Sequence, residues 1–240
     1  MDDNLATSTP VGCWKFDERV TKQFDSHVQK SVNGYGIVQD MCALTGDWLA
    51  PDGATIVDLG CSTGTTLARI AERHSGRTYS AVGYDCAQHM LDAAESKLAH
   101  VKNVSARFLN QRIEDGLIHE NATLTISVFT LQFLRPEQRQ SVLVDAWNRT
   151  VVGGALLIAE KTIPDDARWA LIAAEQLQAD KAAQGLPAEE VLAKPQTLRG
   201  VLIPRRESEL IEEITASGWS TPETLWRRLG WSLVGAFKEK

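Results

Sequence analysis

Two patterns of apolar residues divide the chain. Near its start, apolar side chains recur four positions apart from Phe16 to Val32, which predicts an amphipathic helix over 16–35, and a second helix follows over 37–49. Between 55 and 160, short apolar runs alternate with helical stretches, which is typical of βαβ units around a parallel sheet. This region is expected to hold strands at 55–59, 79–84, 104–108, 123–129 and 154–159, and helices at 65–73, 87–100 and 136–147.

The alternation stops after position 161. Helices are expected over 167–183 and 207–217, a mixed segment lies between them, and two short strands close the chain at 224–228 and 232–238. The predicted fold is therefore α/β and Rossmann-like, with a mostly parallel seven-stranded sheet whose last strand is antiparallel. Its expected parts are an N-terminal helical cap (1–50), a ligand-binding core (51–162), a helical cap insertion (163–220) and closing strands of the core (221–240).

Composition narrows the class of protein. The 240 residues are 43% hydrophobic and 23% charged, which is ordinary for a globular protein. The formal net charge of −6, with no basic block, disfavours direct binding of nucleic acid. No apolar run approaches the roughly 18–20 residues that span a bilayer, and the acidic start lacks the pattern of a signal peptide. We therefore expect a cytoplasmic protein without membrane contacts.

Metal and nucleophile motifs are missing from the sequence. The four cysteines lie far apart, and no pair has the spacing of a zinc site or suggests a disulfide framework. The five histidines form no cluster, and no G-x-S-x-G segment is present. We therefore expect no metal and assign no catalytic residue.

The most informative segment runs from Asp58 to Gly64 (DLGCSTG), after a predicted strand and before a predicted helix. Glycines there allow a tight turn and close approach of a ligand, and the helix start offers unpaired N–H groups. The spacing differs from the G-x-G-x-x-G of dinucleotide-binding loops. It resembles motif I of class I S-adenosylmethionine-dependent methyltransferases, whose loop holds the amino-acid end of the cofactor. The alternative is a tight turn in another doubly wound protein.

Two further polar residues follow strands. Asp85 ends the second predicted strand, where a carboxylate can accept hydrogen bonds from ribose hydroxyls; the alternative is a helix cap, because Asp85 and Gln88 have capping-box spacing. We favour the ribose role. Gln132 follows the fourth strand, at the sheet edge where ligands of open α/β folds bind, and is a candidate substrate residue.

Most of the chain resembles the bacterial carboxy-S-adenosyl-L-methionine synthases of the tRNA uridine-modification pathway. The resemblance covers about residues 12–237, and its N-terminal and fourth-strand segments are more specific than motif I alone. The matching segments are Trp14-x-Phe16-Asp17-Glu18-Arg19-Val20, Ser31-Val32-x-Gly34-Tyr35, Asp58-Leu59-Gly60-Cys61-Ser62, Glu120-Asn121-Ala122, Phe129-Thr130-Leu131-Gln132-Phe133-Leu134-x-Pro136, Gly153-Gly154-Ala155-Leu156, Glu160-Lys161, Leu225-Trp226 and Ser232-Leu233-Val234.

The resemblance implies the class I methyltransferase fold, S-adenosyl-L-methionine as cofactor and a homodimer. Three implied cofactor positions depart from the family pattern: Arg112 stands where the family has an acid, and Cys86 and Val128 stand where it has Asn. Together with Gly64 of motif I, the implied cofactor-binding residues are Tyr35, Gly60, Cys61, Ser62, Asp85, Cys86, Arg112, Ile113 and Val128.

A fourth departure concerns the reaction. The family uses an Arg to hold the carboxylate of the carboxylated cofactor, and Pro195 aligns there, with Lys194 before it and Arg199 four positions later. Pro removes the guanidinium that would pair with this anion, although Arg199, Arg205 or Arg206 could substitute from another direction.

Three functions remain open at this point. We favour a methyltransferase acting on a small molecule, with an aromatic or heterocyclic metabolite as one option. The first alternative is carboxy-S-adenosyl-L-methionine synthesis from S-adenosylmethionine and prephenate, and the second is a non-catalytic cofactor-binding protein. Trp14, Trp169 and Trp219 lie in or beside the capping segments and could stack on a planar substrate, although core packing is favoured for each of them; Trp48 is expected in the core. The candidate substrate residues are thus Gln132, Trp14, Trp169 and Arg199.

Overall fold

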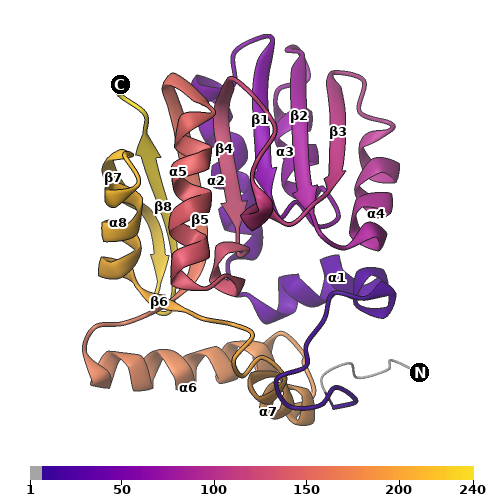
Figure 1. Ribbon diagram of the computed structural model, residues 1–240. Helices are drawn as coiled ribbons and strands as arrows, with labels where there is room; N and C mark the ends of the chain where they lie inside the picture. The colour runs from indigo at the N-terminus through magenta and orange to yellow at the C-terminus, as the bar shows by residue number, and fades with distance from the viewer. Residues whose placement is uncertain (1–6) are drawn as a thin grey trace.

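The computed structural model describes residues 7–240 and has one central sheet (Figure 1). The strand order is β3-β2-β1-β4-β5-β8-β7, and a two-residue strand, β6, pairs with β5. All pairings along this order are parallel except those of β8, which runs antiparallel to both of its neighbours. The strands are β1 (Ala54–Leu59), β2 (Tyr79–Asp85), β3 (Val104–Asn110), β4 (Ala122–Val128), β5 (Thr150–Ile163), β6 (Arg205–Arg206), β7 (Ser220–Arg228) and β8 (Trp231–Phe237).

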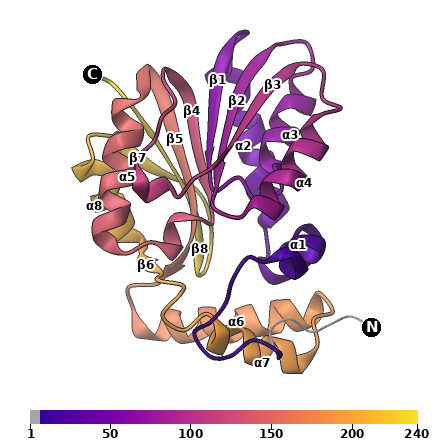
Figure 2. The ribbon, with the colours of Figure 1, turned by 45° about the vertical axis from the view of Figure 1, so that its right-hand side comes forward.

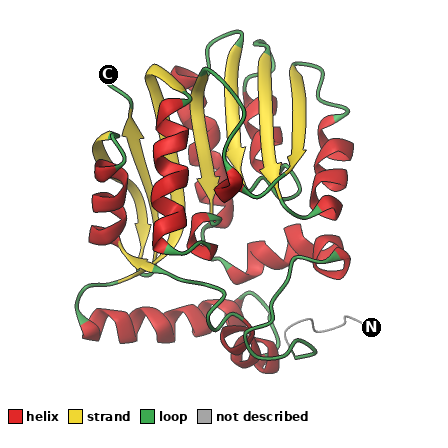
Figure 3. Cartoon of the chain, in the orientation of Figure 1, coloured by secondary structure: helices red, strands yellow, loops and turns green. Residues whose placement is uncertain are grey.

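The helices lie on both faces of the sheet and across one end of it (Figure 3). Within the described residues, no helix is long and apolar enough to cross a membrane. The helices are α1 (Glu18–Ser31), α2 (Tyr35–Leu49), α3 (Thr65–Arg73), α4 (Gln88–Leu98), η1 (Ile113–Asp115), η2 (Leu131–Phe133), α5 (Pro136–Asn148), α6 (Ala167–Ala183), α7 (Ala188–Thr197) and α8 (Glu207–Ala216).

These elements confirm the predicted fold class; α7, β6 and the 3₁₀ turns η1 and η2 were not predicted, and β5 is longer than predicted. The mixed segment contains the regular helix α7, and β5 begins four residues earlier and ends four residues later than the predicted strand 154–159. β5 is long because it pairs with β4 and β8 and continues past them to pair with β6. The homodimer implied by the family resemblance stays a prediction.

The sheet separates two hydrophobic cores. Along β1, Ile56 packs into the core on one face while Val57 and Leu59 pack into the core on the other, since alternate side chains of a strand point to opposite faces. A parallel strand covered on both faces needs a continuous apolar run, which explains the sequence of β1. Figure 2 shows α2, α3 and α4 on one side of the sheet and α5 and α8 on the other.

The cap is smaller than the predicted segments 1–50 and 163–220. In α2, Val38 and Cys42 are fully buried in the first core, and in α8, Leu210 and Ile214 are buried in the second. Both helices therefore belong to the sheet layer. The cap proper consists of α1, α6 and α7, which Figure 1 shows together below the sheet.

Two tryptophans differ from their expected environments. Trp48 is 75% exposed, because the face of α2 that contacts the sheet is formed by Val38, Cys42 and Gly46 instead. Trp219 is 1% exposed and donates its ring N–H to the Leu143 carbonyl, so it belongs to the second core rather than to the cap. The prediction of Trp48 as a core residue was therefore wrong.

A buried ionic group connects β5 with the helices on the second face. Arg139 of α5 donates to both carboxylate oxygens of Glu160 at 2.9 and 3.0 Å, and its Nε donates to Glu213 of α8 at 2.9 Å. The side chains of Arg139 and Glu160 are completely buried. Removing one partner from such a pair leaves an uncompensated charge inside the protein.

Substitution Glu160→Ala is therefore expected to lower the free energy of unfolding by about 3–5 kcal/mol. Urea denaturation of the variant measures this loss. The matched control is Glu120→Ala, whose carboxylate pairs with Arg149 at the surface and should contribute no more than about 1 kcal/mol. Equal losses in the two variants would contradict the role assigned to the buried pair.

Candidate functional site

A cavity of about 380 Å³ lies where the sheet meets the cap. Its walls come from the loops after β1, β2 and β4, from the end of β5, and from α1, α6 and α7. Carboxyl ends of parallel strands converge at this edge, which is the usual ligand site of open α/β sheets. The predicted site residues that line it are Trp14, Tyr35, Gly60, Ser62, Asp85, Cys86, Arg112, Ile113, Val128 and Gln132.

The loop after β1 needs its glycines. Gly60 has φ +86°, and a Cβ there would overlap the side chain of Thr130; Gly64 has φ +72°, and a Cβ there would lie 2.9 Å from Leu98. The backbone N–H groups of Gly60 and Cys61 both donate to the Tyr84 carbonyl at 2.8 Å. The loop is thereby fixed against β2, and α3 begins directly behind it.

Cys61 and Gly64 belong to this loop but do not line the cavity. The Cys61 side chain is buried and faces Gly83, where an added Cβ would lie 2.7 Å from its sulfur. Gly64 packs against α4. Both residues therefore shape the loop. The loop residues that a ligand in the cavity can reach are Gly60 and Ser62.

Asp85 braces the loop and faces the cavity. Its Oδ2 accepts from the Ser62 N–H at 3.0 Å, and its Oδ1 accepts from the Ala87 N–H at 2.9 Å. Gln88 donates to Asp92 rather than closing a capping box with Asp85, and the N-cap of α4 is Ala87. Burial raises the pKa of Asp85. Each oxygen accepts one bond and can accept another, so bracing the loop and binding a diol are compatible.

A second carboxylate lies beneath the loop. Asp58 is 2% exposed, and its Oδ1 has no hydrogen-bond partner in the described part of the chain. Burial, together with repulsion from Asp85, raises the pKa of Asp58 to about 8. A cationic ligand in the loop would offset this cost, and S-adenosylmethionine carries an ammonium and a sulfonium. The residues present therefore fit that cofactor.

An acidic side chain reaches the cavity near the position where the family pattern has one. Arg112 is exposed, and its Nε donates to Glu114 Oε1 at 2.8 Å. Glu114 has a nearly buried side chain and lines the cavity. The acid is thus supplied two residues later than the sequence comparison placed it, from the 3₁₀ turn η1.

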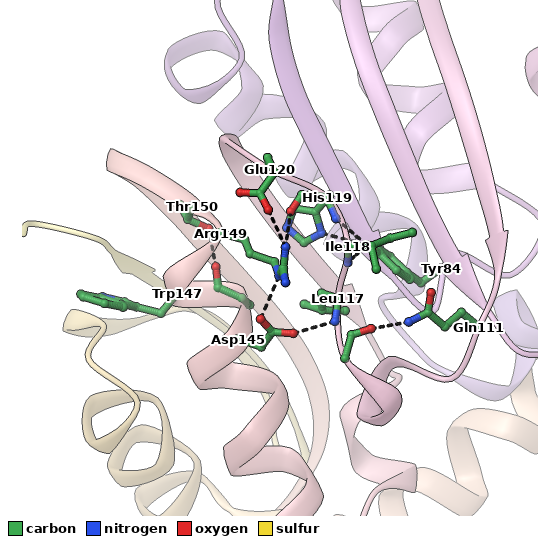
Figure 4. Close-up of polar contacts among 12 residues, drawn as sticks. Tyr84, Gln111, Leu117, Ile118, His119, Glu120, Asp145, Trp147, Arg149 and Thr150 are labelled. Atoms are coloured by element: carbon green, nitrogen blue, oxygen red, sulfur yellow. Dashed lines mark hydrogen bonds and ion pairs between the residues drawn. The ribbon is translucent and has the colours of Figure 1, made fainter.

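A polar network holds the segment 111–120 in place (Figure 4). The Tyr84 hydroxyl accepts from the N–H groups of Ile118 and His119 at 2.9 and 3.0 Å, and lies 3.1 Å from His119 Nδ1. Asp145 of α5 accepts from the Leu117 N–H and from Arg149. Burial lowers the pKa of His119 to about 4. The network fixes the cavity wall that carries Arg112, Ile113 and Glu114.

Gln132 lines the cavity, and both ends of its amide bond to the backbone. Its Nε2 donates to the Phe129 carbonyl at 3.1 Å, and its Oε1 accepts from the Lys161 N–H at 2.8 Å. Its own carbonyl accepts from the Ile203 N–H at 2.7 Å. Gln132 therefore positions β4, β5 and the segment before β6, and its role as a substrate residue stays a prediction.

An aromatic wall next to Gln132 was not foreseen. Phe129 has φ +60° and stacks on Tyr35 with ring centroids 5.8 Å apart, while Trp231 meets its edge at 5.2 Å. All three side chains line the cavity. A non-glycine residue with positive φ is unfavourable and is held here by its neighbours. The sequence signals were the position of Phe129 at the end of a strand and the presence of Phe129 and Tyr35 in segments that resemble the synthases.

Two predicted substrate residues lie outside the cavity. Trp169 is 57% exposed, one turn into α6 and far along the helix from the part that carries Lys181. Arg199 is exposed, after the end of α7. Neither side chain lines the cavity. The residue near Arg199 that does line it is Lys194 of α7. Trp14, in contrast, is buried in the wall, with the Lys194 ammonium over its ring.

Three lysines line the cap side of the cavity and were not predicted: Lys161 of β5, Lys181 of α6 and Lys194 of α7. Burial lowers the pKa of each of them, most strongly that of Lys194, to about 6. Only Lys161 carried a signal, as the polar residue near the end of a predicted strand. Lys181 and Lys194 have no local pattern that marks them.

Polar contacts join helix α1 to the motif loop, to α4 and to α7 of the cap. Its Asp25 accepts from Thr63 and Thr65 of the loop region and pairs with Lys97 of α4 at 2.8 Å. Its His27 lies 3.1 Å from Glu190 of α7. These contacts close the cavity on the side of α1.

Comparison with known proteins gives the family. A model of the methyltransferase domain matches residues 56–154. The chain is 31% identical over 228 residues to a carboxy-S-adenosyl-L-methionine synthase of Campylobacter fetus subsp. fetus, with 94% of each chain covered. It is 33% identical to the synthase of Trichodesmium erythraeum, covering 93% of this chain and 88% of the relative.

Solved structures share the fold at low sequence identity. An O-methyltransferase family protein from Burkholderia thailandensis matches with a TM-score of 0.62 and 18% identity over 93% of this chain and 61% of that one. A structure described as PigF with SAH matches with a TM-score of 0.54 and 14% identity over 77% of this chain and 56% of that one. The relatives indicate an enzyme that binds S-adenosylmethionine. The chain belongs to the class I S-adenosylmethionine-dependent methyltransferase superfamily and, within it, to the carboxy-S-adenosyl-L-methionine synthase family.

Proposed function

We propose that this enzyme transfers the methyl group of S-adenosylmethionine to a small molecule enclosed in the cavity. The observation that carries the proposal is the continuity of one cavity from the motif loop to an apolar chamber under the cap. A chamber roofed by α1, α6 and α7 admits a small molecule and shields it from water. When bound, S-adenosylmethionine supplies an electrophilic methyl group.

The motif loop and its neighbours are suited to hold the cofactor. The backbone of Gly60 and Ser62 would receive its amino-acid end, and Asp58, buried behind this loop, would balance the ammonium charge from there. Asp85 would accept hydrogen bonds from the ribose hydroxyls. Ile113, Cys86 and Glu114 line the adjoining wall, where the adenine would lie.

The enzyme's contribution to rate would be positioning and exclusion of water. Holding two reactants in line replaces a bimolecular encounter by a unimolecular step. The aromatic wall of Tyr35, Phe129 and Trp231 limits how a small acceptor can lie against the cofactor. No general base is assigned, because an acceptor that is already nucleophilic needs none.

The second candidate function is synthesis of carboxy-S-adenosyl-L-methionine. Relatives with that name match over nearly the whole chain, which favours it. The position of the missing guanidinium weighs against it: Pro195 and Arg199 lie outside the cavity, and Arg112 is paired with Glu114. We therefore place methyl transfer first.

Mass spectrometry of ligand released from the purified protein separates the two candidates. The proposal expects S-adenosylmethionine or S-adenosylhomocysteine. It also expects no carboxylated cofactor after incubation of the protein with S-adenosylmethionine and prephenate. Release or formation of carboxy-S-adenosylmethionine would overturn methyl transfer and establish the second candidate.

Substitution Asp85→Ala is expected to weaken S-adenosylmethionine binding more than about tenfold, because two charge-assisted hydrogen bonds to the ribose would be lost. Isothermal titration calorimetry measures the affinity. Asp85→Asn keeps one acceptor oxygen and should lie between the variant and the parent protein. Asp92→Ala, an exposed carboxylate on α4, is the control and should bind normally. An unchanged affinity in Asp85→Ala would leave Asp85 with the loop-bracing role alone.

A further inference from the structure

The cap side of the cavity concentrates positive charge without an anion to balance it. Lys161, Lys181 and Lys194 come from β5, α6 and α7 and converge on one chamber. Within residues 7–240, the structure assigns none of their ammonium groups a hydrogen bond or ion pair, and Lys194 is only 9% exposed. Long cationic side chains are rarely buried in this way unless something pairs with them.

Lys161, Lys181 and Lys194 line the same chamber, and their charges act on one another. Besides burial, repulsion from Lys161 lowers the pKa of Lys181 to about 8, and repulsion from Lys181 lowers that of Lys194 to about 6. Each of these charges therefore disfavours the charge of its neighbour. An anion placed among them would stabilise all three ammonium forms.

The groups already facing the lysines do not meet this need. Glu190 of α7 favours the ammonium forms of Lys181 and Lys194, but its carboxylate lies 3.1 Å from His27 Nδ1 on α1 and makes no ion pair with either lysine. The pKa of His27 is lowered by burial, and further by Lys194, to about 4, so His27 is neutral at pH 7. The Lys194 ammonium lies over the Trp14 ring, which attracts a cation but supplies no negative charge.

We propose that Lys161, Lys181 and Lys194 bind the carboxylate of the small-molecule substrate. The surrounding wall is apolar and aromatic, so the rest of that molecule would be apolar, packed against side chains such as Phe16, Phe24 and Leu177. This inference rests on the proposed function, because it takes the bound acid to be the substrate. The substrate class that it names is small apolar acids carrying one carboxylate.

A carboxylate fits better than a more highly charged group. A doubly charged oxyanion would lose more hydration in an apolar chamber than these lysines could return.

Calorimetric titration with benzoate and with its neutral isostere benzamide tests the proposal, using protein saturated with S-adenosylhomocysteine at pH 7. Benzoate is expected to bind at least about tenfold more tightly than benzamide, since one charge-assisted contact amounts to more than a factor of ten. Lys194→Met and Lys181→Met keep the apolar stems and should each lose most of the preference for benzoate. Lys102→Met, an exposed lysine elsewhere, is the control.

The pH dependence gives a second readout. The charged or titratable groups facing the site are Lys161, Lys181, Lys194, Glu190 and His27. A carboxylate binds the ammonium forms, so benzoate affinity should fall as the pH rises from 6 to 9, while benzamide affinity should not change. Lys194→Met should flatten the lower part of this profile.

The outcomes separate this site from the proposed function. Equal affinities for benzoate and benzamide, no benzoate binding, or an unchanged preference in both lysine variants would overturn the carboxylate site. S-adenosylmethionine affinity is measured in parallel, and its retention shows that the variants are folded. Benzoate preference with no methyl transfer to any small acid would support the anion site while contradicting the proposed function.

Discussion

The amide of Gln132 ties together the three parts of the molecule that meet at the cavity. The side-chain amide donates to the Phe129 carbonyl after β4 and accepts from the Lys161 N–H in β5. The backbone carbonyl of Gln132 accepts from the N–H of Ile203, which follows α7. A strand end that stops at a ligand site leaves backbone groups without ladder partners. Gln132 satisfies these groups internally, and this allows Phe129 to keep its unusual conformation beneath a cap of fixed position.

The cavity gathers groups whose burial is unfavourable. Asp85 lines the cavity at the motif loop, and Asp58 is buried behind that loop with its Oδ1 unpaired among the described residues, while Lys181 and Lys194 line the cavity at the cap. Arg139 and Glu160, which are buried elsewhere, neutralise each other where no ligand is involved. The acidic groups at one end of the cavity are complementary to the cationic cofactor, and the amines at the other end are complementary to the acid proposed as substrate.

The sequence predicted the sheet and its helices because their apolar periodicity is local. β1 packs against a core on each face, so its sequence is a continuous apolar run, and that run is visible in the sequence. Trp48 was misplaced because periodicity tells which residues share a helix face and not which face is covered. Lys181 and Lys194 were missed because only the packing of α6 and α7 across the end of the sheet brings them to the cavity. Gln132 was located correctly, but its hydrogen bonds depend on three separate segments.

The exposed and buried cysteines differ in their reactivity, and one exposed cysteine lines the cavity. Cys42 and Cys61 are buried, with burial raising the pKa of both thiols, so neither forms the thiolate that alkylating reagents attack. Cys86 is exposed and lines the cavity, although partial burial and the charge of Asp85 raise the pKa of its thiol; Cys13 is exposed outside the cavity. Covalent labelling at Cys86, referenced to labelling at Cys13 in the same molecule, therefore reads whether the cavity is filled, without any knowledge of the ligand or of turnover.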